Sequence, residues 1–309
     1  MAMWNSVWFC RLIPSVVMLA GPLASAQPRP QPGTLNSLRG EVWMNGIPAG
    51  PIAAGRITLE SGQAIKTGEG MAELLLTPGS FLRLGDHSEL TLEAAGTSEI
   101  RVRLRTGESL LELLDLHAPI VLEQNGVTIV VRKPGLYDFD DKRGLTMIYD
   151  GEAQLSRNNK RIVARKGFAV RARSLREFPA NRDPGSPLFS WSSLRSEQLS
   201  SESEASSLAY PGGAGKQHGS AWYWNPWSAS YTWISSSGVV TGPFGWSYYS
   251  PGYVPNYLPV LGGGDSYSHS SPVAPGLGPM QPADPARPGA VPAVPLTAPG
   301  VPQFPNNRF

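Results

Sequence analysis

The residues that could carry out catalysis are few, and their spacing does not suit it. Asp86, His87 and Ser88 supply the three residue types of a nucleophilic triad. As neighbours in a tight turn they cannot easily form the relay in which a base reaches the nucleophile and a third group orients the base. The four histidines show no ligand spacing, and no glycine-rich phosphate loop is present. We therefore predict a non-enzymatic protein without a cofactor.

The densest acidic cluster consists of Asp138, Asp140 and Asp141, and alternation along a strand would place Asp138 and Asp140 on one face. A hard cation prefers such oxygen ligands, but glycine and further oxygen ligands at fixed spacing are missing. A solvated loop before Gly144 explains the cluster better, and no metal site is predicted.

A basic segment follows this cluster, because eight basic residues and no acidic residue lie between Arg157 and Arg176. One interpretation is a patch for anionic lipid headgroups or cell-wall phosphates. The other is a solvated edge that protects the sheet against self-association. The candidate residues of the patch are Arg161, Arg165, Lys166, Arg171 and Arg173.

The segment from Ala221 to Tyr257 holds twelve aromatic residues and no Asp, Glu, Lys or Arg. Its frequent glycines and prolines argue against a long helix or continuous strands. Such rings can pack back onto a scaffold, stack on sugar rings or lie at a membrane interface, and all three interpretations stay open. The candidate binding surface consists of Trp222, Trp224, Trp227, Trp233, Trp246, Tyr248 and Tyr249.

These residues must be positioned by a fold that is predominantly β. Between Leu38 and Ala172, about thirteen short segments alternate with period two or are rich in β-branched residues, and turns such as Asn125-Gly126 separate them. The spacing predicts an all-β sandwich, barrel or β-roll. In the segment 100–104 the apolar residues face one way and the arginines the other, which suits a sheet with one wet face. The leucines of 110–114 fit a helix as well as a strand.

An internal repeat runs through this region. The phrase Lys66-Thr67-Gly68-Glu69, with Glu73 following, returns 39 residues later as Arg105-Thr106-Gly107-Glu108, with Glu112 following. This predicts a recurring structural unit.

The two ends of the chain have their own signatures. Residues 1–26 have the layout of a secretory signal peptide that is cleaved after Ala26, which predicts export to the periplasm or cell envelope. Cys10 is the only cysteine, so the mature chain would hold no disulfide. The net charge of +2 gives no reason to expect nucleic-acid binding. After Gly264 a proline recurs every three or four residues, which predicts a disordered tail.

The expected organisation follows from these signals. The spacing of Leu188, Trp191, Leu194 and Leu199 predicts a short amphipathic helix. The predicted parts are a signal peptide (1–26), a linker (27–37), a β domain (38–176), a linker (177–187), the helix (188–208), a Gly- and aromatic-rich segment (209–264) and a Pro-rich tail (265–309).

The order of several motifs in the β domain resembles the FecR family of periplasmic domains. The motifs are Gly40-Glu41-Val42, Ile65-Lys66-Thr67-Gly68, Ala72-Glu73-Leu74, Pro78-Gly79-Ser80-Phe81-Leu82-Arg83-Leu84, Ser88-Glu89-Leu90-Thr91-Leu92 and Thr106-Gly107-Glu108. The resemblance implies an all-β fold, a FecR-like β-roll or sandwich, and a non-enzymatic role. Founding members of the family relay an outer-membrane transport signal through the inner membrane to a sigma factor.

The chain departs from that family plan in two places. Only eleven residues precede the apolar stretch of the leader, so direct control of a sigma factor is not expected. The run Val130-Val131-Arg132-Lys133-Pro134-Gly135-Leu136-Tyr137 stands where many members carry Gly-Thr before the next strand. We therefore expect an envelope scaffold, sensor or protein-binding module with an envelope protein as partner. The alternative is peptidoglycan or glycan binding through the aromatic segment, and a membrane surface is a further candidate partner.

Overall fold

The computed structural model describes residues 29–180, 185–209 and 219–254. Within these residues β-strands dominate, so the predicted all-β class is confirmed. The predicted signal peptide and the Pro-rich tail lie outside the described residues. No helix of the described part is long and apolar enough to span a membrane.

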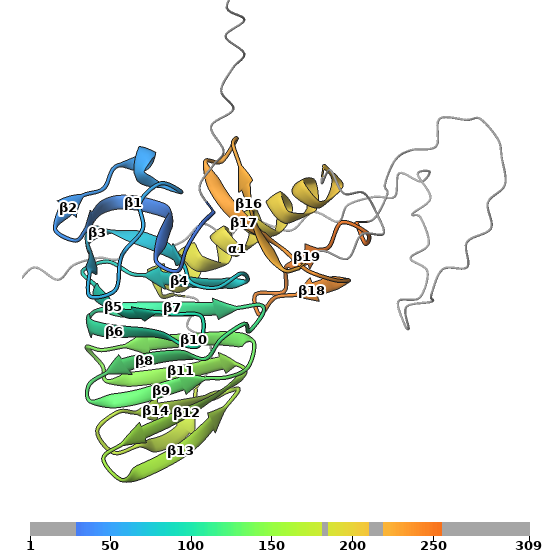
Figure 1. The fold of residues 1–309 in the computed structure, drawn as a ribbon. Coiled ribbons are helices and arrows are strands. Elements are labelled where there is room, and N and C mark those ends of the chain that lie inside the picture. The colour runs from blue at the N-terminus through green and yellow to red at the C-terminus, as the bar shows by residue number, and fades with distance from the viewer. Residues whose placement is uncertain (1–28, 181–184, 210–218, 255–309) are drawn as a thin grey trace, which may run out of the picture. The chain divides into compact units, whose positions relative to one another are not determined.

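Fifteen strands pair into one large sheet that doubles back on itself at β3 (Ala64–Leu75). The first residues of β3 pair with β5 and its last residues pair with β4. Two runs of strands therefore descend from β3 in Figure 1, one through β5 to β13 and the other through β4 to β15. The remaining bounds are β1 (Thr34–Met44), β2 (Ile47–Pro48), β4 (Ser80–Leu84), β5 (Glu89–Ala95), β6 (Ile100–Thr106), β7 (Glu108–Leu113), β8 (Ile120–Gln124), β9 (Val127–Val131), β10 (Gly135–Asp140), β11 (Leu145–Asp150), β12 (Glu152–Arg157), β13 (Lys160–Arg165), β14 (Phe168–Arg171) and β15 (Arg176–Pro179).

The main hydrophobic core lies between the two runs of strands, because side chains from both runs belong to one buried cluster. Ile100, Val102 and Leu104 point into it, while Arg101 and Arg103 stay partly exposed. The alternation predicted for 100–104 is thus confirmed, and the sandwich rests on apolar burial without any disulfide.

Of the ambiguous leucines in 110–114, Leu110, Leu111 and Leu113 belong to the strand β7 and Leu114 follows its end, and the sheet is buried on both faces here. Leu111 and Leu113 belong to the main core, while Leu110 and Leu114 face a second layer on the outside of β7. A strand that is buried on both sides shows a continuous apolar run in place of alternation.

That second layer consists of the C-terminal part of the described chain. It contains the helix α1 (Pro187–Leu208) and two hairpins, β16 (Ala221–Asn225) with β17 (Ser230–Ile234) and β18 (Val239–Thr241) with β19 (Ser247–Tyr249). The strands are short, as the frequent glycines and prolines predict. Figure 1 shows α1 and both hairpins beside the upper strands of the sheet.

The helix has the predicted length, but its buried face differs from the prediction. Leu188 and Leu199 are buried, whereas Leu194 is 65% exposed. Serines form most of the face that contacts the sheet and hairpins, namely Ser192, Ser196, Ser200, Ser203, Ser206 and Ser207. The small serine side chains let the helix lie close to the sheet and hairpins and form hydrogen bonds with them. The predicted apolar face of the helix contributes little to this contact.

Candidate functional site

A buried charge network lies where the second layer meets the sheet. β4 runs between β3 and β7, and its residue Arg83 is directly opposite Glu73 of β3. Arg83 Nε lies 2.7 Å from Glu73 Oε2, and Arg83 Nη1 lies 2.8 Å from Glu112 Oε2 on β7. All three side chains are fully buried. Glu73 and Glu112 occupy equivalent positions of the internal repeat, so the two repeats supply one carboxylate each to the same arginine.

The helix completes this network from the other side. Arg195 of α1 places Nη2 2.9 Å from Glu73 Oε1, and Ser196 Oγ donates a hydrogen bond of 2.7 Å to Glu112 Oε1. Asn36 Nδ2 of β1 donates a further bond of 2.9 Å to Glu73 Oε1. Elements far apart in the sequence therefore converge on two carboxylates.

The charges of the network decide its protonation states. Burial alone would raise the pKa of Glu73, but the guanidinium groups of Arg195 and Arg83 outweigh it and lower this pKa to about 2. Burial raises the pKa of Glu112 above its ordinary value, although Arg83 opposes this shift. Glu73 is thus a carboxylate at all physiological pH values. An ion pair of this kind gains little net stability, but removing one member leaves a buried charge without compensation.

Apolar contacts surround the network and hold the hairpins against the sheet. Leu75, Phe81 and Leu114 of the sheet region form one cluster with side chains of α1 and the hairpins. The ring of Trp222 meets that of Phe81 edge-on, with 5.2 Å between the ring centres. The other members from the second layer are Leu199, Tyr231, Trp233 and Tyr248. Five described rings of the aromatic segment therefore pack against the scaffold, namely those of Trp222, Trp224, Tyr231, Trp233 and Tyr248.

The seven predicted aromatic residues do not form one surface. Trp233 and Tyr248 are buried, with 1% and 0% exposure, and Tyr248 exchanges a hydrogen bond of 3.1 Å with Ser196. Burial raises the pKa of Tyr248 well above its ordinary value. Trp222, Trp224 and Tyr249 are half-buried, Trp246 is 37% exposed and Trp227 is 96% exposed. Of the predicted set, only Trp227 stands almost entirely in solvent.

The five predicted basic residues are all exposed near β13 and the β14–β15 hairpin. Part of their charge is balanced, because Arg165 pairs with Glu152 at 3.1 Å and Lys166 pairs with Asp150 at 3.3 Å. Arg171 lies over the ring of Phe178. β13 is an end strand of the sheet, which is the position in which charged side chains deter edge-to-edge pairing. Arg161 and Arg173, the other two residues of the predicted basic patch, are also exposed.

The triad-like turn is held together by hydrogen bonds with the backbone. Ser88 Oγ donates to the Asp86 carbonyl at 3.0 Å and accepts from the Glu108 amide at 2.9 Å. Gly107 is required beside it, since a Cβ there would lie 2.1 Å from Ser88 Oγ. The hydroxyl is thereby engaged in the turn, and His87 has a left-handed backbone with φ of +48°.

The acidic cluster does not lie in a solvated loop, and that prediction is wrong for Asp138 and Asp140. Both belong to β10 and are buried, with 1% and 7% exposure, because the second layer covers part of this face. Burial, followed by the nearby Glu108, raises the pKa of Asp138 well above its ordinary value. Its Oδ2 accepts a hydrogen bond of 3.0 Å from the Tyr149 hydroxyl. Among the described residues no cluster of three or more metal-ligating side chains occurs.

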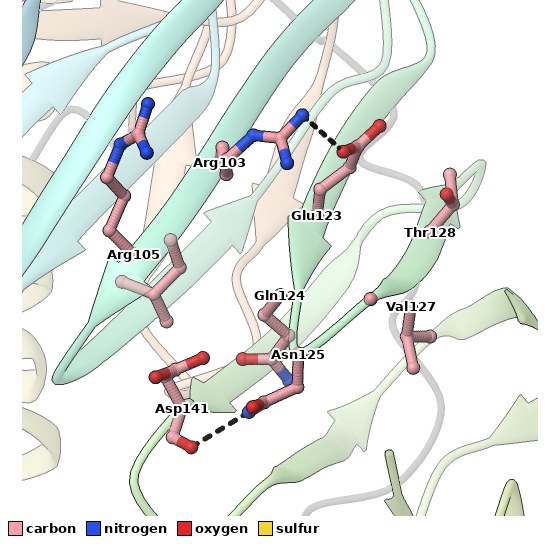
Figure 2. A pocket seen from close by; sticks show the side chains of 10 residues that line it. Arg103, Arg105, Glu123, Gln124, Asn125, Val127, Thr128 and Asp141 are labelled. Carbon is pink, nitrogen blue, oxygen red and sulfur yellow. Dashed lines mark hydrogen bonds and ion pairs between the residues drawn. The ribbon is translucent and has the colours of Figure 1, made fainter. Parts of the chain in front are cut away.

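A groove of about 400 Å³, lined mostly by polar side chains, opens on the run of strands from β5 to β13. We refer to it as the polar groove. Arg103 and Arg105 of β6 form one wall, and Arg105 Nε donates to Thr91 Oγ1 at 2.9 Å. Thr128 of β9 and Asp141 lie on the other sides (Figure 2). The other lining residues are Leu104, Glu123, Gln124, Asn125, Gly126 and Val127.

Two hydrogen-bond acceptors beside this groove have no partner among the described residues: the enclosed Oε1 of Gln124 and the half-buried carboxylate of Asp141. Gln124 is 2% exposed, and its Nε2 donates to the Leu145 carbonyl at 2.9 Å and to Thr146 Oγ1 at 2.8 Å. Its Oε1 accepts no hydrogen bond. Figure 2 shows the carboxamide of Gln124 and the carboxylate of Asp141 turned toward each other. The main-chain carbonyl of Asp141 accepts a hydrogen bond of 2.8 Å from Asn125 Nδ2, which holds the backbone at this end of the groove.

Comparisons with known proteins identify no family for this chain. No family model matches it, and no curated protein does. Two crystal structures described as a putative anti-sigma factor from Parabacteroides distasonis are similar, each with a TM-score of 0.34. One is 10% identical and the match covers 43% of this chain and 64% of its own, which is less than two thirds of its length. The other is 9% identical, with 56% of this chain and 99% of its own covered. Similarity this weak carries no argument about function.

Proposed function

We propose that this chain is an exported, non-enzymatic envelope protein of FecR-like type that acts as a scaffold, sensor or protein-binding module, with the polar groove as the site for its protein partner. The ordered motifs of the β domain support the FecR-like assignment, and the all-β fold agrees with it. Export rests on the leader-like residues 1–26.

The observation that carries the binding role is the half-buried carboxylate of Asp141, which has no partner among the described residues. A partly buried charged group without a partner costs stability unless a ligand supplies one. The guanidinium of Arg105 lies in the opposite wall of the groove. The groove thus offers acceptors and donors together.

A polypeptide segment suits this combination. Its N–H groups and its Lys or Arg side chains would donate to Asp141, while its carbonyl or carboxylate oxygens would accept from Arg105. Small-molecule sites of similar volume are lined mainly by apolar side chains, whereas this lining is mostly polar. Glycan binding through the aromatic segment is less favoured, because Trp233 and Tyr248 face the sheet.

The test is photo-crosslinking in the cells that produce the protein. A photoreactive residue replaces Thr128, a half-buried wall residue, and in a control chain it replaces Val163, which is 43% exposed on β13. The proposal expects a discrete protein adduct from position 128 alone. The double substitution Asp141→Asn with Arg105→Gln should reduce this adduct roughly tenfold, since charged hydrogen bonds are lost.

Glu177→Gln is the matched control, because Glu177 is an exposed acidic residue on β15 outside the groove. It should leave the adduct unchanged. Equal labelling from positions 128 and 163, no adduct at position 128, or an adduct indifferent to the double substitution would each overturn the proposal.

A further inference from the structure

Two turns present large apolar side chains to solvent. Trp227 lies in the turn between β16 and β17 and is 96% exposed, and Ile52 lies in the short helical turn η1 (Pro51–Ala53) and is 78% exposed. We call these residues the apolar tips. Single apolar side chains that are partly exposed are common on protein surfaces and need no explanation. A tryptophan that keeps nearly its whole ring in water is different, because this large apolar surface gains the most from being covered.

The tips belong to neighbouring parts of the molecule. The ring of Trp224, at the end of β16, lies so close to Gly55 that a Cβ there would be 2.2 Å from the ring. Gly55 follows Ile52 by three residues, and Trp227 follows Trp224 by three residues. Both turns point toward the top of Figure 1, where η1 is the short blue turn after β2.

The hairpin that carries Trp227 is fixed to the β domain. Asn36 Nδ2 donates to the Tyr231 carbonyl at 2.9 Å, and the Tyr231 amide donates to Asn36 Oδ1 at 2.7 Å. Within the turn, the Trp227 amide donates to Asn225 Oδ1 at 3.0 Å. The exposed ring is therefore held on an ordered support, and little conformational freedom remains to be lost when it is covered.

The two segments that carry the tips contain no charged residue, and the carboxylate that accepts a hydrogen bond of 3.3 Å from Ser230 Oγ beside the Trp227 turn belongs to the buried Glu202. No Asp, Glu, Lys or Arg occurs in 45–55 or in 219–254. Arg56 follows directly, is exposed and forms no ion pair with a described residue. The combination of a tryptophan, an aliphatic side chain, neutral flanks and one unpaired cation is the pattern of an interfacial anchor on anionic lipid.

We propose that the apolar tips dock this protein onto a lipid bilayer surface, with Trp227 and Ile52 at the level of the headgroups and Arg56 beside an anionic phosphate. The tips are convex turns, and neither lines the polar groove. A protein partner would need a pocket for each tip, whereas a bilayer accepts separate protrusions without a shaped site. This surface is separate from the polar groove and does not depend on the role proposed for it.

The test uses the full chain as the producing cell delivers it, mixed with vesicles of phosphatidylglycerol and phosphatidylethanolamine. Trp227→Ala and Ile52→Ser should each weaken vesicle binding about tenfold, because each removes most of one inserted apolar side chain. Arg56→Gln should weaken binding about fivefold on anionic vesicles and leave binding to neutral phosphatidylcholine vesicles unchanged. Leu194→Ala is the matched control, since Leu194 is 65% exposed on α1, and it should have no effect.

Quenching of tryptophan fluorescence by brominated lipids gives a second readout. The fluorescence of the wild type should be quenched on binding, and Trp227→Ala should lose most of this quenching. The melting temperature of Trp227→Ala should equal that of the wild type, because the ring is almost entirely in water. Absence of vesicle binding by the wild type, equal binding by all variants, or quenching that persists in Trp227→Ala would overturn the inference. Loss of a protein adduct in Trp227→Ala with unchanged vesicle binding would assign the tips to a protein partner and also overturn it.

Discussion

Replacing Glu73 by glutamine should destabilise the protein by about 3 to 5 kcal/mol at pH 7. The side chain keeps its shape, but Arg195 loses its carboxylate partner and Arg83 keeps only Glu112. An independent figure comes from the pKa of Glu73, which falls from its ordinary 4.5 to about 2 on folding. At 1.36 kcal/mol per pH unit this corresponds to about 3 kcal/mol at neutral pH.

The sign of the pH dependence follows from the lowered pKa. A carboxyl group with a folded-state pKa below its unfolded value contributes stability above pH 4.5, and this contribution is lost as the pH falls toward 2. The difference between wild type and Glu73→Gln should therefore be largest above pH 5 and shrink steadily below pH 4.5. Glu112 does not mimic this behaviour, because its pKa is raised and protonation favours its folded form.

Urea unfolding followed by tryptophan fluorescence, repeated at pH values from 7 to 3, measures the free-energy cost of Glu73→Gln and the change of that cost with pH. Glu123→Gln is the control, since Glu123 pairs with Arg101 and Arg103 at a partly exposed site and should cost less than about 1 kcal/mol. A cost below about 1 kcal/mol for Glu73→Gln at pH 7, or a cost that does not change with pH, would refute the reasoning.

Three further predictions concern the second layer and the sheet beneath it. Trp233→Ala should cost about 3 to 5 kcal/mol in urea unfolding, because a 1% exposed ring leaves a cavity; a cost near zero would show that the hairpin does not pack on the sheet. Ser203→Ala should be neutral or stabilise by up to about 1 kcal/mol in thermal unfolding, because the buried Oγ has no hydrogen bond, and a clear loss of stability would contradict this. Asp138→Asn should be more stable than the wild type at pH 7. The folded-state pKa of Asp138 is raised, so the wild type loses stability as the pH rises above the ordinary pKa of an aspartic acid. The gain in the free energy of unfolding should vanish below pH 4, and a gain that persists there would contradict the raised pKa.

The fold class could be predicted because the strand signals are local. Alternation in 100–104 and the Asn125-Gly126 turn depend on neighbours in the sequence, and the structure confirms the strands and the left-handed backbone of that turn. The internal repeat likewise indicated a recurring unit. It could not indicate that Glu73 and Glu112 share one arginine, because that contact depends on β4 lying between β3 and β7.

The parts that were missed depend on tertiary burial. Asp138 was expected in solvent because carboxylates are usually exposed, and only the covering second layer places it inside. The buried face of α1 carries serines, so apolar periodicity pointed to Leu194, which is exposed. The polar groove left no pattern in the sequence, since β6, β8 and the residue after β10 meet only in the folded sheet.

Hydrogen exchange of the intact chain is the most direct test of the claim that the C-terminal hairpins and helix are an integral layer of this protein. The account predicts that the amides of β17 and α1 are protected to a degree comparable with those of β4 and β7, and that Glu73→Gln lowers the protection of β17 and α1 first. Rapid exchange throughout β17 and α1 in the wild type, with β4 and β7 still protected, would contradict it.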